Sequence, residues 1–251
     1  MNMNKHTTPH SPSKSPLHKD ATHESAGRHV SGEALYVDDL PEPPRALLAW
    51  PITSPVARGV ITRLDVSGAL EEAGVKRVFT AADIPGVNDI SPFSHDEPLL
   101  AERELYSTGQ LIALVVGESY EACRRGAARV ELEIEERPAL LSVAEADAAG
   151  SYHGTPHFMR RGDVEAALNA APVRFKGEVH TGGQDHFYLE THAALAVPQE
   201  GGCVMVHSST QHPSEVQAKI AEVLGVSRER VVVEARRMGG GFGGKETQGN
   251  H

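Results

Sequence analysis

Cysteine is scarce in this sequence, and its scarcity excludes several kinds of protein. Cys123 and Cys203 are the two cysteines among 251 residues, and they form no Cys-x-x-Cys pair. A disulfide-rich secreted scaffold, a zinc ribbon and a set of iron–sulfur ligands all need more cysteines. Two isolated cysteines are typical of a reducing compartment. We therefore predict a cytoplasmic protein in which both side chains are buried as small hydrophobic groups.

Positive charge and long apolar runs are also scarce. The chain has 24 Lys and Arg against 34 Asp and Glu, which gives a formal net charge of -10. This balance disfavours binding to nucleic acid or to an anionic membrane, because both need a clustered cationic face. No apolar run approaches the roughly 20 residues of a membrane span. Apolar residues still make up 39% of the chain, enough for a buried core, although aromatic residues make up 5%.

The first 26 residues have almost no apolar side chains. They are mainly Ser, Thr, Pro, His and Lys, whereas a secretory signal needs a hydrophobic stretch. This composition predicts a disordered tail over 1–26. Four histidines in it are too irregularly spaced to indicate a metal site, so we expect them to be solvated: His6, His10, His18 and His23.

Behind this tail, the spacing of apolar residues predicts a mixed α+β domain over 27–140. Strands are expected where apolar and β-branched residues alternate or run together, and helices where a Ser cap precedes an apolar face. The expected strands are 46–53, 58–66, 75–80, 111–119 and 130–136, and the expected helices are 67–74 and 119–130. The class is α+β because strands and helices alternate irregularly and the strands are short.

A connector over 141–172, with short helices expected at 142–150 and 162–171, leads to a second unit over 173–251. The most regular helix of the chain is expected in that unit, because Pro213 suits a first turn and Gly225 suits a helix end. The expected elements of the unit are strands 173–182, 193–199, 203–210 and 229–238, and helix 213–225.

The run GGGFGG follows the last expected strand and precedes Lys245 and Glu246. The spacing of a dinucleotide fingerprint is met by Gly239, Gly241 and Gly244. Such a fingerprint should open a helix and be followed about 20 residues later by an acidic ribose ligand, and neither follows here. A P-loop needs a hydroxyl residue after its lysine, where Glu246 stands instead and would repel phosphate. A nucleotide site is therefore disfavoured.

A tight turn without a ligand would explain one or two of these glycines through positive φ. Five glycines around a single phenylalanine carry a large cost in backbone entropy. Close approach of the main chain to a bound ligand is therefore the preferred interpretation of the run.

Three stretches together resemble the molybdenum hydroxylases, the family of xanthine dehydrogenase and aldehyde oxidase. RMGGGFGGKE resembles the signature loop of that family, TGGQDHFYLETHAALAVP its Gly-Gly-Gln segment, and SSTQHPSEVQAKIAEVLGV its Ser-Thr-Gln-x-Pro segment. Residues 27–41 and 97–140 resemble the family's front domain. The resemblance, which covers about 27–248, implies the aldehyde oxidase/xanthine dehydrogenase α/β hammerhead domain over 27–140. The start of a molybdopterin-binding domain would follow over 173–251.

Within the family, the likeness is greatest to the N-terminal part of the molybdopterin-binding subunit of bacterial xanthine dehydrogenases. It implies an oxidoreductase that hydroxylates hypoxanthine and xanthine towards urate, with water as the oxygen source and NAD as the final acceptor. The implied cofactor is molybdenum-molybdopterin, with iron–sulfur clusters and FAD on a partner subunit or other domains of a hetero-oligomer. Oxidoreductases for aldehydes and other N-heterocycles share the scaffold, so the substrate stays open.

The resemblance also implies roles for individual residues. Gln184 would hydrogen-bond an oxygen ligand of molybdenum through its side-chain amide, which donates without adding charge. Phe242, with Gly241 and Gly243 beside it, would present backbone N–H groups near the apical oxo ligand. Glu246 would hydrogen-bond a purine in the substrate pocket. Without the resemblance, Gln184 would be interpreted as a polar residue that ends a strand.

Other polar residues near these motifs receive no catalytic role. His186 and His192 are predicted to be structural, because the family's molybdenum takes no protein side chain directly, and Asp185 and Glu190 stay unassigned. The family's catalytic glutamate and most pterin-binding groups would lie beyond residue 251. The resemblance therefore implies an N-terminal portion that is inactive alone. The alternative class is a non-catalytic hammerhead interaction module.

Overall fold

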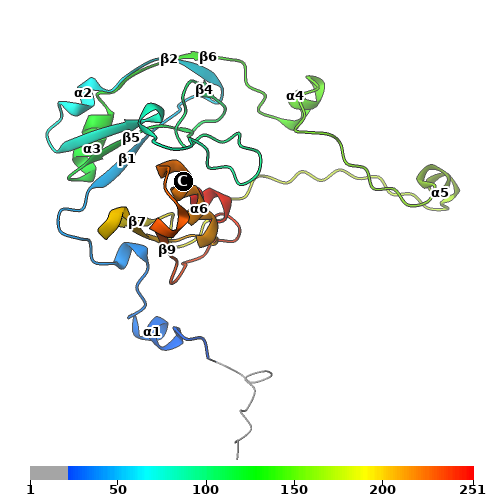
Figure 1. Ribbon diagram of the computed structural model, residues 1–251. Coiled ribbons are helices and arrows are strands. Elements are labelled where there is room, and N and C mark those ends of the chain that lie inside the picture. The colour runs from blue at the N-terminus through cyan, green and yellow to red at the C-terminus, as the bar shows by residue number, and fades with distance from the viewer. Residues whose placement is uncertain (1–21) are drawn as a thin grey trace, which may run out of the picture.

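The computed structural model describes residues 22–251 of the chain (Figure 1). Of the predicted disordered tail, residues 1–21 lie outside the described part. The last residue of that predicted tail, Ala26, begins helix α1 (Ala26–Ser31). Within residues 22–251, no helix is long and apolar enough to cross a membrane.

Two three-stranded antiparallel sheets build the N-terminal unit. In one sheet β5 lies between β1 and β3, and in the other β2 lies between β4 and β6. The strands are β1 (Leu48–Thr53), β2 (Gly59–Asp65), β3 (Val75–Thr80), β4 (Glu104–Leu105), β5 (Leu111–Gly117) and β6 (Glu131–Glu136). The predicted α+β class is confirmed, and each strand expected in this unit is present.

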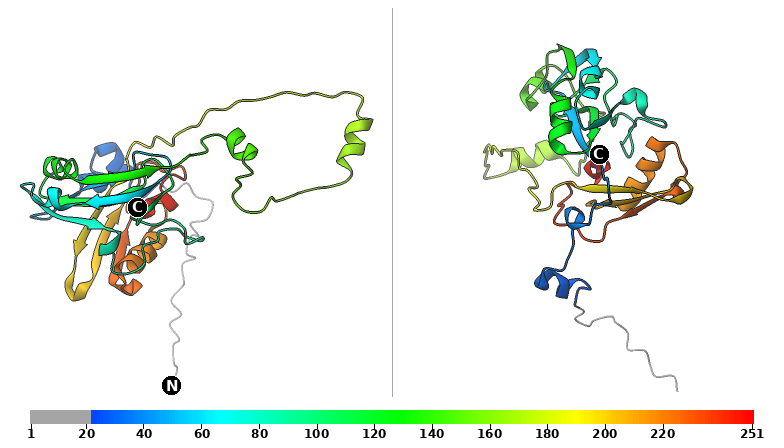
Figure 2. Two further views of the ribbon diagram at one scale, coloured as in Figure 1. Left: turned by 90° about the horizontal axis from the view of Figure 1, so that it is seen from above. Right: turned by 90° about the vertical axis from the view of Figure 1, so that its left-hand side faces the viewer.

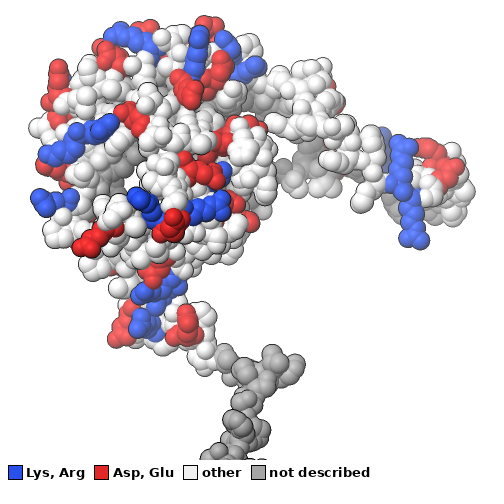
Figure 3. All heavy atoms as spheres, in the orientation of Figure 1, with Lys and Arg blue, Asp and Glu red and all other residues white. Residues whose placement is uncertain are grey.

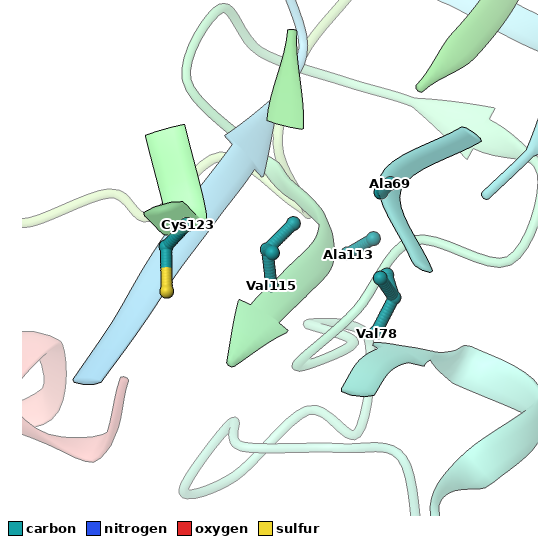
Figure 4. Close-up of a cluster of buried hydrophobic side chains, with 5 residues drawn as sticks. All are labelled: Ala69, Val78, Ala113, Val115 and Cys123. Carbon is teal, nitrogen blue, oxygen red and sulfur yellow. The ribbon is translucent and has the colours of Figure 1, made fainter. Parts of the chain in front are cut away.

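Helices α2 (Ser67–Leu70) and α3 (Tyr120–Ala127) pack on the first sheet. The Ser119 side chain caps α3 by accepting the backbone N–H of Ala122 at 3.2 Å. The helix expected over 67–74 is shorter than predicted and ends at Leu70. Buried apolar side chains of these helices and strands form a core beside the sheet (Figure 4): Ala69, Val78, Ala113, Val115 and Cys123.

The second sheet of this unit has a core of its own. Ala101, Leu105 and Ile112 are almost completely buried there, and partly buried side chains of β2 and β6 pack around them. Because β5 contributes Ile112 to this core and Val115 to the other, it joins the two sheets into one unit.

The connector between the two units extends away from the rest of the structure (Figure 2). It contains the two expected short helices, α4 (Val143–Ala148) and α5 (Val164–Ala170). The strand expected over 173–182 is wrong, because this stretch has no regular secondary structure. Its apolar side chains have no protein layer to pack on, as Phe175 at 96% exposed and Val179 at 86% exposed show. A strand also needs a partner strand for its backbone hydrogen bonds.

A third sheet forms the C-terminal unit, with β8 (Val204–Ser208) between β7 (Ala194–Pro198) and β9 (Val231–Glu234). β7 pairs with β8 in the antiparallel direction, whereas β8 and β9 are parallel. A parallel pair needs a crossover connection, which α6 (Pro213–Leu224) supplies while packing on β9. Gly225 ends α6 in the left-handed conformation, with φ of 65°, as its sequence position predicts.

The two units meet where a loop of the N-terminal unit touches the end of α6. The backbone N–H groups of Gly86 and Val87 donate to the carbonyls of Val223 and Glu222, each at 2.9 Å. A side chain at position 86 would collide with the Glu222 carbonyl, so glycine permits this close contact.

Basic and acidic side chains are interspersed on the face seen in Figure 3. Several of them form ion pairs on the N-terminal unit, such as Lys76 with Glu118 at 2.6 Å. The charge distribution of this face is therefore mixed, in agreement with the acidic balance of the sequence.

Cys123 is buried and Cys203 is partly exposed, and both thiols are free. The predicted burial is confirmed for Cys123, where desolvation raises the thiol pKa. Burial of Cys203 is not complete, because it precedes β8 directly after a turn at the surface.

Candidate functional site

The glycine loop, residues 239–244, follows β9 and packs against two other segments of the C-terminal unit. One is the stretch 186–192 before β7, and the other surrounds Gln211, which lies between β8 and α6. Because β8 and β9 are parallel neighbours, their carboxyl ends lie at the same edge of the sheet. Gln211 and the glycine loop follow these two ends and are thereby brought together, as ligand-binding residues are in open parallel sheets.

Four of the five glycines are required by protein packing. A Cβ atom at Gly240 would lie 2.9 Å from the Tyr188 Cβ, and one at Gly241 would lie 2.5 Å from the Gln211 Oε1. A Cβ at Gly239 would collide with Glu190 and one at Gly244 with Tyr188. In the described structure, the close neighbours of these four glycines are therefore other segments of the chain.

The tip of the loop differs from its sides. Gly243 has open space around its Cα atom and a φ of 92°, which favours glycine. Phe242 before it has a φ of 50° and a side chain that is 74% exposed. A positive φ is uncommon for a bulky residue. The tip therefore projects from the packed part of the loop and leaves room for a ligand.

The stretch 186–192 directs alternate side chains at the loop. His186, Tyr188 and Glu190 are the neighbours that a Cβ on the loop glycines would meet. Phe187 and Leu189 point away and are 91% and 98% exposed. The alternation resembles that of a strand, although this stretch pairs with no strand in the described structure.

A buried ion pair lies beneath the loop. Lys245 is 0% exposed, and its Nζ lies 3.4 Å from the Oε2 of Glu190 and 4.7 Å from the centroid of the Tyr188 ring. Glu190 also accepts the backbone N–H of Gly239 at 2.6 Å and that of Val37 at 3.3 Å. The positive charge of Lys245 is therefore compensated inside the protein and does not face a ligand.

Gln211 holds the other side of the loop. Its Oε1 accepts the backbone N–H of Gly243 at 2.9 Å and that of Lys245 at 3.2 Å. The Lys245 carbonyl in turn accepts the Gln211 N–H at 2.8 Å and the Thr210 hydroxyl at 3.2 Å. The Nε2 of Gln211 has no hydrogen-bond partner among residues 22–251, and the side chain is exposed. This amide therefore keeps two donors available beside the loop.

Sequence reasoning missed Gln211 as a site residue and quoted it only within the Ser-Thr-Gln-x-Pro motif. The available signal was its position directly after one strand and before a helix, with the glycine loop directly after another strand. That signal becomes decisive only once β8 and β9 are known to be parallel neighbours.

The predicted site residues do not all come together. Phe242, Gly241 and Gly243 lie in the loop, and the exposed Glu246 follows it. Gln184 lies on the exposed, irregular stretch before residue 186, and none of its hydrogen bonds joins it to the loop in the described structure. Gly243 donates its N–H to Gln211 rather than outward. The roles assigned to these residues stay predictions.

His192 lies beside the same cluster. Its Nε2 is 2.6 Å from the Tyr188 hydroxyl, and desolvation together with the positive charge of Lys245 lowers the pKa of His192. The neutral imidazole is thus favoured. No group of three or more His, Cys, Asp and Glu side chains that could hold a metal ion occurs within residues 22–251.

Several cavities adjoin the C-terminal unit. An open cavity of about 510 Å³ adjoins Gln211 and is also lined by Arg236, Arg237 and Met238, which lead into the loop. A larger one of about 860 Å³ lies between residues 106–111 and the end of the chain, and no loop glycine lines either cavity. We place the candidate site at the loop tip and Gln211, because the available donors are there.

The loop tip and Gln211 can donate hydrogen bonds to a ligand that carries acceptor atoms. Within the described residues, the Phe242 N–H and the Gln211 Nε2 are hydrogen-bond donors without an acceptor. Both are neutral, and the nearby Lys245 is already paired. Neutral donors suit oxygen acceptors whose charge the protein does not need to neutralise.

Comparison with known proteins identifies two domains in the chain. Residues 31–138 match the family described as aldehyde oxidase and xanthine dehydrogenase, a/b hammerhead domain. Residues 150–251 match the molybdopterin cofactor-binding domain.

The most similar relatives include two xanthine dehydrogenases. That of Dictyostelium discoideum is 39% identical over 237 residues, covering 94% of this chain and 17% of the relative. Xanthine dehydrogenase 1 of Arabidopsis thaliana is 42% identical over 230 residues, covering 90% and 17%. The chain thus spans about a sixth of the length of these relatives.

Among solved structures, the aldehyde oxidoreductase from Desulfovibrio gigas is similar with a TM-score of 0.77 and 28% sequence identity. The superposition covers 88% of this chain and 27% of that chain. Both the sequence and the fold therefore match a part of much longer proteins.

Proposed function

Because the chain belongs to the molybdenum hydroxylase family of xanthine dehydrogenase and aldehyde oxidase, we propose that it acts within a xanthine dehydrogenase. It supplies the hammerhead domain over 27–140, the connector over 141–172 and the first part of the molybdopterin-binding domain over 173–251. The enzyme hydroxylates hypoxanthine and xanthine towards urate, with water as the oxygen source and NAD as the final acceptor. Identities of 39% and 42% to proteins named xanthine dehydrogenase support this substrate.

One observation carries the proposal. The carboxyl ends of the parallel strands β8 and β9 bring Gln211 against the glycine loop and leave the loop tip exposed. Two neutral donors, the Phe242 N–H and the Gln211 Nε2, are free there. Bound molybdopterin would supply the oxygen-transfer and electron-transfer chemistry at this place.

The residues of this chain orient the cofactor and the substrate. The backbone N–H of Phe242 would help to hold the cofactor by a hydrogen bond, and the open space at Gly243 would leave room for it. Gln211 would donate through Nε2, which makes it an alternative to the predicted donor Gln184, and the variants described below distinguish the two. Glu246 extends from the end of the loop, where an exposed carboxylate can accept a hydrogen bond from a purine N–H.

Electron carriers reside elsewhere in this proposal. An iron–sulfur cluster needs a set of cysteine ligands, and the two free cysteines here lie on separate units. Iron–sulfur clusters and FAD therefore belong to a partner subunit or to other domains, in a hetero-oligomer in the cytoplasm.

The test starts from the tagged protein isolated from its native cells with the polypeptides that accompany it. We expect molybdenum by elemental analysis, a pterin by mass spectrometry, and xanthine-dependent reduction of NAD with formation of urate. Molybdenum with oxidation of aldehydes but not purines would keep the family role and change the substrate. A complete preparation without molybdenum and pterin would contradict the proposal.

Two matched variants distinguish the glutamines. Gln211→Glu keeps an acceptor for the loop N–H groups but removes the donors at Nε2, so turnover should fall about 100-fold. Gln184→Glu makes the same chemical change on the exposed stretch and should leave turnover nearly unchanged. The reverse order would return the cofactor contact to Gln184.

A further inference from the structure

Lys245 is the largest side chain that is completely buried in the described structure. Lysine is almost never fully buried unless its charge is paired. Here the pairing is with Glu190 at 3.4 Å, and the ring of Tyr188 lies under the ammonium group at 4.7 Å. Burial of this charge directly after a glycine loop carries a desolvation cost, which its contacts have to offset.

Glu190 connects both ends of the loop. Its Oε2 accepts the N–H of Gly239, the first glycine, at 2.6 Å, and its own N–H donates to the Gly239 carbonyl at 3.2 Å. The same oxygen faces the ammonium group of Lys245, the residue after the last glycine. One carboxylate therefore holds the entry and the exit of the loop together.

The same carboxylate reaches a third segment. Its Oε1 accepts the N–H of Val37, in the 3-10 turn Val37–Asp39 near the start of the described chain. Segments around residues 37, 190, 239 and 245 thus meet at one buried side chain.

We infer that the Glu190–Lys245 pair is the positioning element of the glycine loop, and that it sets where the loop tip points. The inference deepens the proposed function and rests on it for the identity of the ligand. Glu190 and Lys245 act through Phe242 and Gln211 and do not touch the ligand.

An apolar pair would fill the same space but would not position the loop. Replacing a buried ion pair by apolar residues of similar volume often leaves stability unchanged or raises it. Carboxylate hydrogen bonds are directional, whereas apolar contacts are not. If the pair positions the loop, replacing both charges together should leave the stability of the chain nearly unchanged but make the glycine loop less ordered.

The test uses the 251-residue chain without cofactor and the double variant Glu190→Leu/Lys245→Met. We expect this variant to fold, with an unfolding midpoint close to that of the unaltered chain. Hydrogen exchange at the Gly239 N–H, followed by NMR, should be more than about tenfold faster, because a hydrogen bond to a charged group is lost. Exchange at Gly243 should also accelerate, since its contact with Gln211 depends on the same loop geometry.

A matched control separates this effect from a general loss of charge. Lys76 and Glu118 form an exposed pair at 2.6 Å on the N-terminal unit. The double variant Lys76→Met/Glu118→Leu should leave exchange at Gly239 and Gly243 unchanged.

A second readout reports the buried charge directly. Desolvation is the largest cause of the lowered pKa of His192 and the positive charge of Lys245 adds to it, so the pKa should rise part of the way towards its ordinary value in the double variant. A merely space-filling lysine would leave this titration, followed by NMR of the His192 ring, unchanged.

Several outcomes decide the inference. Unchanged exchange at Gly239 in a folded double variant would overturn it, and so would an unprotected Gly239 N–H in the unaltered chain. If the double variant does not fold, Glu190→Gln keeps the side-chain shape and decides by the same measurement. All these measurements need no molybdenum, so a native preparation without the cofactor would remove the proposed function and leave the positioning result standing.

Discussion

The two units of this chain are stabilised by different kinds of contact. Both clusters of buried apolar side chains lie in the N-terminal unit, where Leu105, Ile112 and Val115 are 0% exposed. The C-terminal unit buries small apolar side chains, Val206, Val216, Ala218, Ala221 and Val231, and as many polar ones: Ser208, Ser209, Thr210, Lys219 and Lys245. Apolar area therefore dominates the interior of the N-terminal unit, whereas the C-terminal unit combines apolar burial with directional bonds, several of which surround the glycine loop.

This difference follows from what each unit has to do. Apolar burial stabilises in proportion to area and does not specify the direction of a side chain. Hydrogen bonds and ion pairs specify position but contribute little net stability. A unit that presents hydrogen-bond donors to a ligand needs directional contacts. Its stability can then depend on a neighbouring unit that has an apolar core. Four substitutions or conditions test this division.

The largest effect is expected in the apolar core. Ile112→Ala should lower the free energy of unfolding by about 2–5 kcal/mol, because it removes buried methyl groups and leaves a cavity. Urea unfolding followed by the fluorescence of Trp50, the single tryptophan, measures this unit. Val232→Ala, at a 48% exposed position of β9, should change stability by less than about 0.5 kcal/mol. Equal effects of the two substitutions would contradict the comparison.

A smaller effect is expected where the glycine loop meets Glu190. Gly239→Ala places a Cβ against the Glu190 Cβ, and such overpacking should cost about 1–3 kcal/mol. Amide exchange in β8 and β9 should report this loss while Trp50 reports little change. Gly182→Ala is the control, since no atom lies within 4 Å of the added group. A loss of stability in the unfolding followed by Trp50 fluorescence would instead mean that the two units unfold together.

Removal of a helix cap should have different effects in the packed N-terminal unit and in the connector. Ser119→Ala removes the cap of α3 and should cost about 1 kcal/mol in the unfolding followed by Trp50. Ser142→Ala removes a cap of the same geometry from α4, which lies on the exposed connector. It should lower the helicity of α4, measured by NMR chemical shifts. The midpoint of the unfolding transition followed by Trp50 fluorescence should stay unchanged. A shift of that transition would show that the connector packs on the rest of the chain.

The smallest effect concerns pH. The folded structure lowers the pKa of His192 below its ordinary value of 6.5, so the unfolded chain binds more protons in that range. The C-terminal unit should therefore lose a little stability as the pH falls from 6.5 through the lowered pKa, and His192→Gln should remove that loss. The effect is small because the side chain is exposed. Amide exchange in β8 at several pH values measures it, and rising protection on acidification would contradict the sign.

Local signals in the sequence predicted most of the fold. Pro213 and Gly225 marked the ends of α6, and Ser119 marked the start of α3, because caps and helix ends depend on a few neighbouring residues. The strand expected over 173–182 failed for the opposite reason. Its alternating pattern is local, but a strand also needs a partner, and none lies beside this stretch in the described structure.

The candidate site also combines features that local sequence signals predict with features that depend on distant segments. The resemblance predicted a ligand loop around Phe242 and Gly243, and the structure shows both residues exposed at the loop tip, while their role stays a prediction. Gln184 and Gln211 could not be distinguished by residue type, since both are glutamines within a motif. Their difference depends on the parallel pairing of β8 and β9, which brings Gln211 within 2.9 Å of the loop.

By itself, the sequence determined the family, the α+β class and the position of the glycine loop, because these depend on motifs and on the short-range spacing of apolar residues. The tertiary structure alone decided which side chains surround the loop. Glu190 and Lys245 are separated by 55 residues, and nothing local relates them. They meet because the β7–β8–β9 sheet brings the segments before β7 and after β9 together. Since both side chains are buried, each charge needs the opposite charge as its partner.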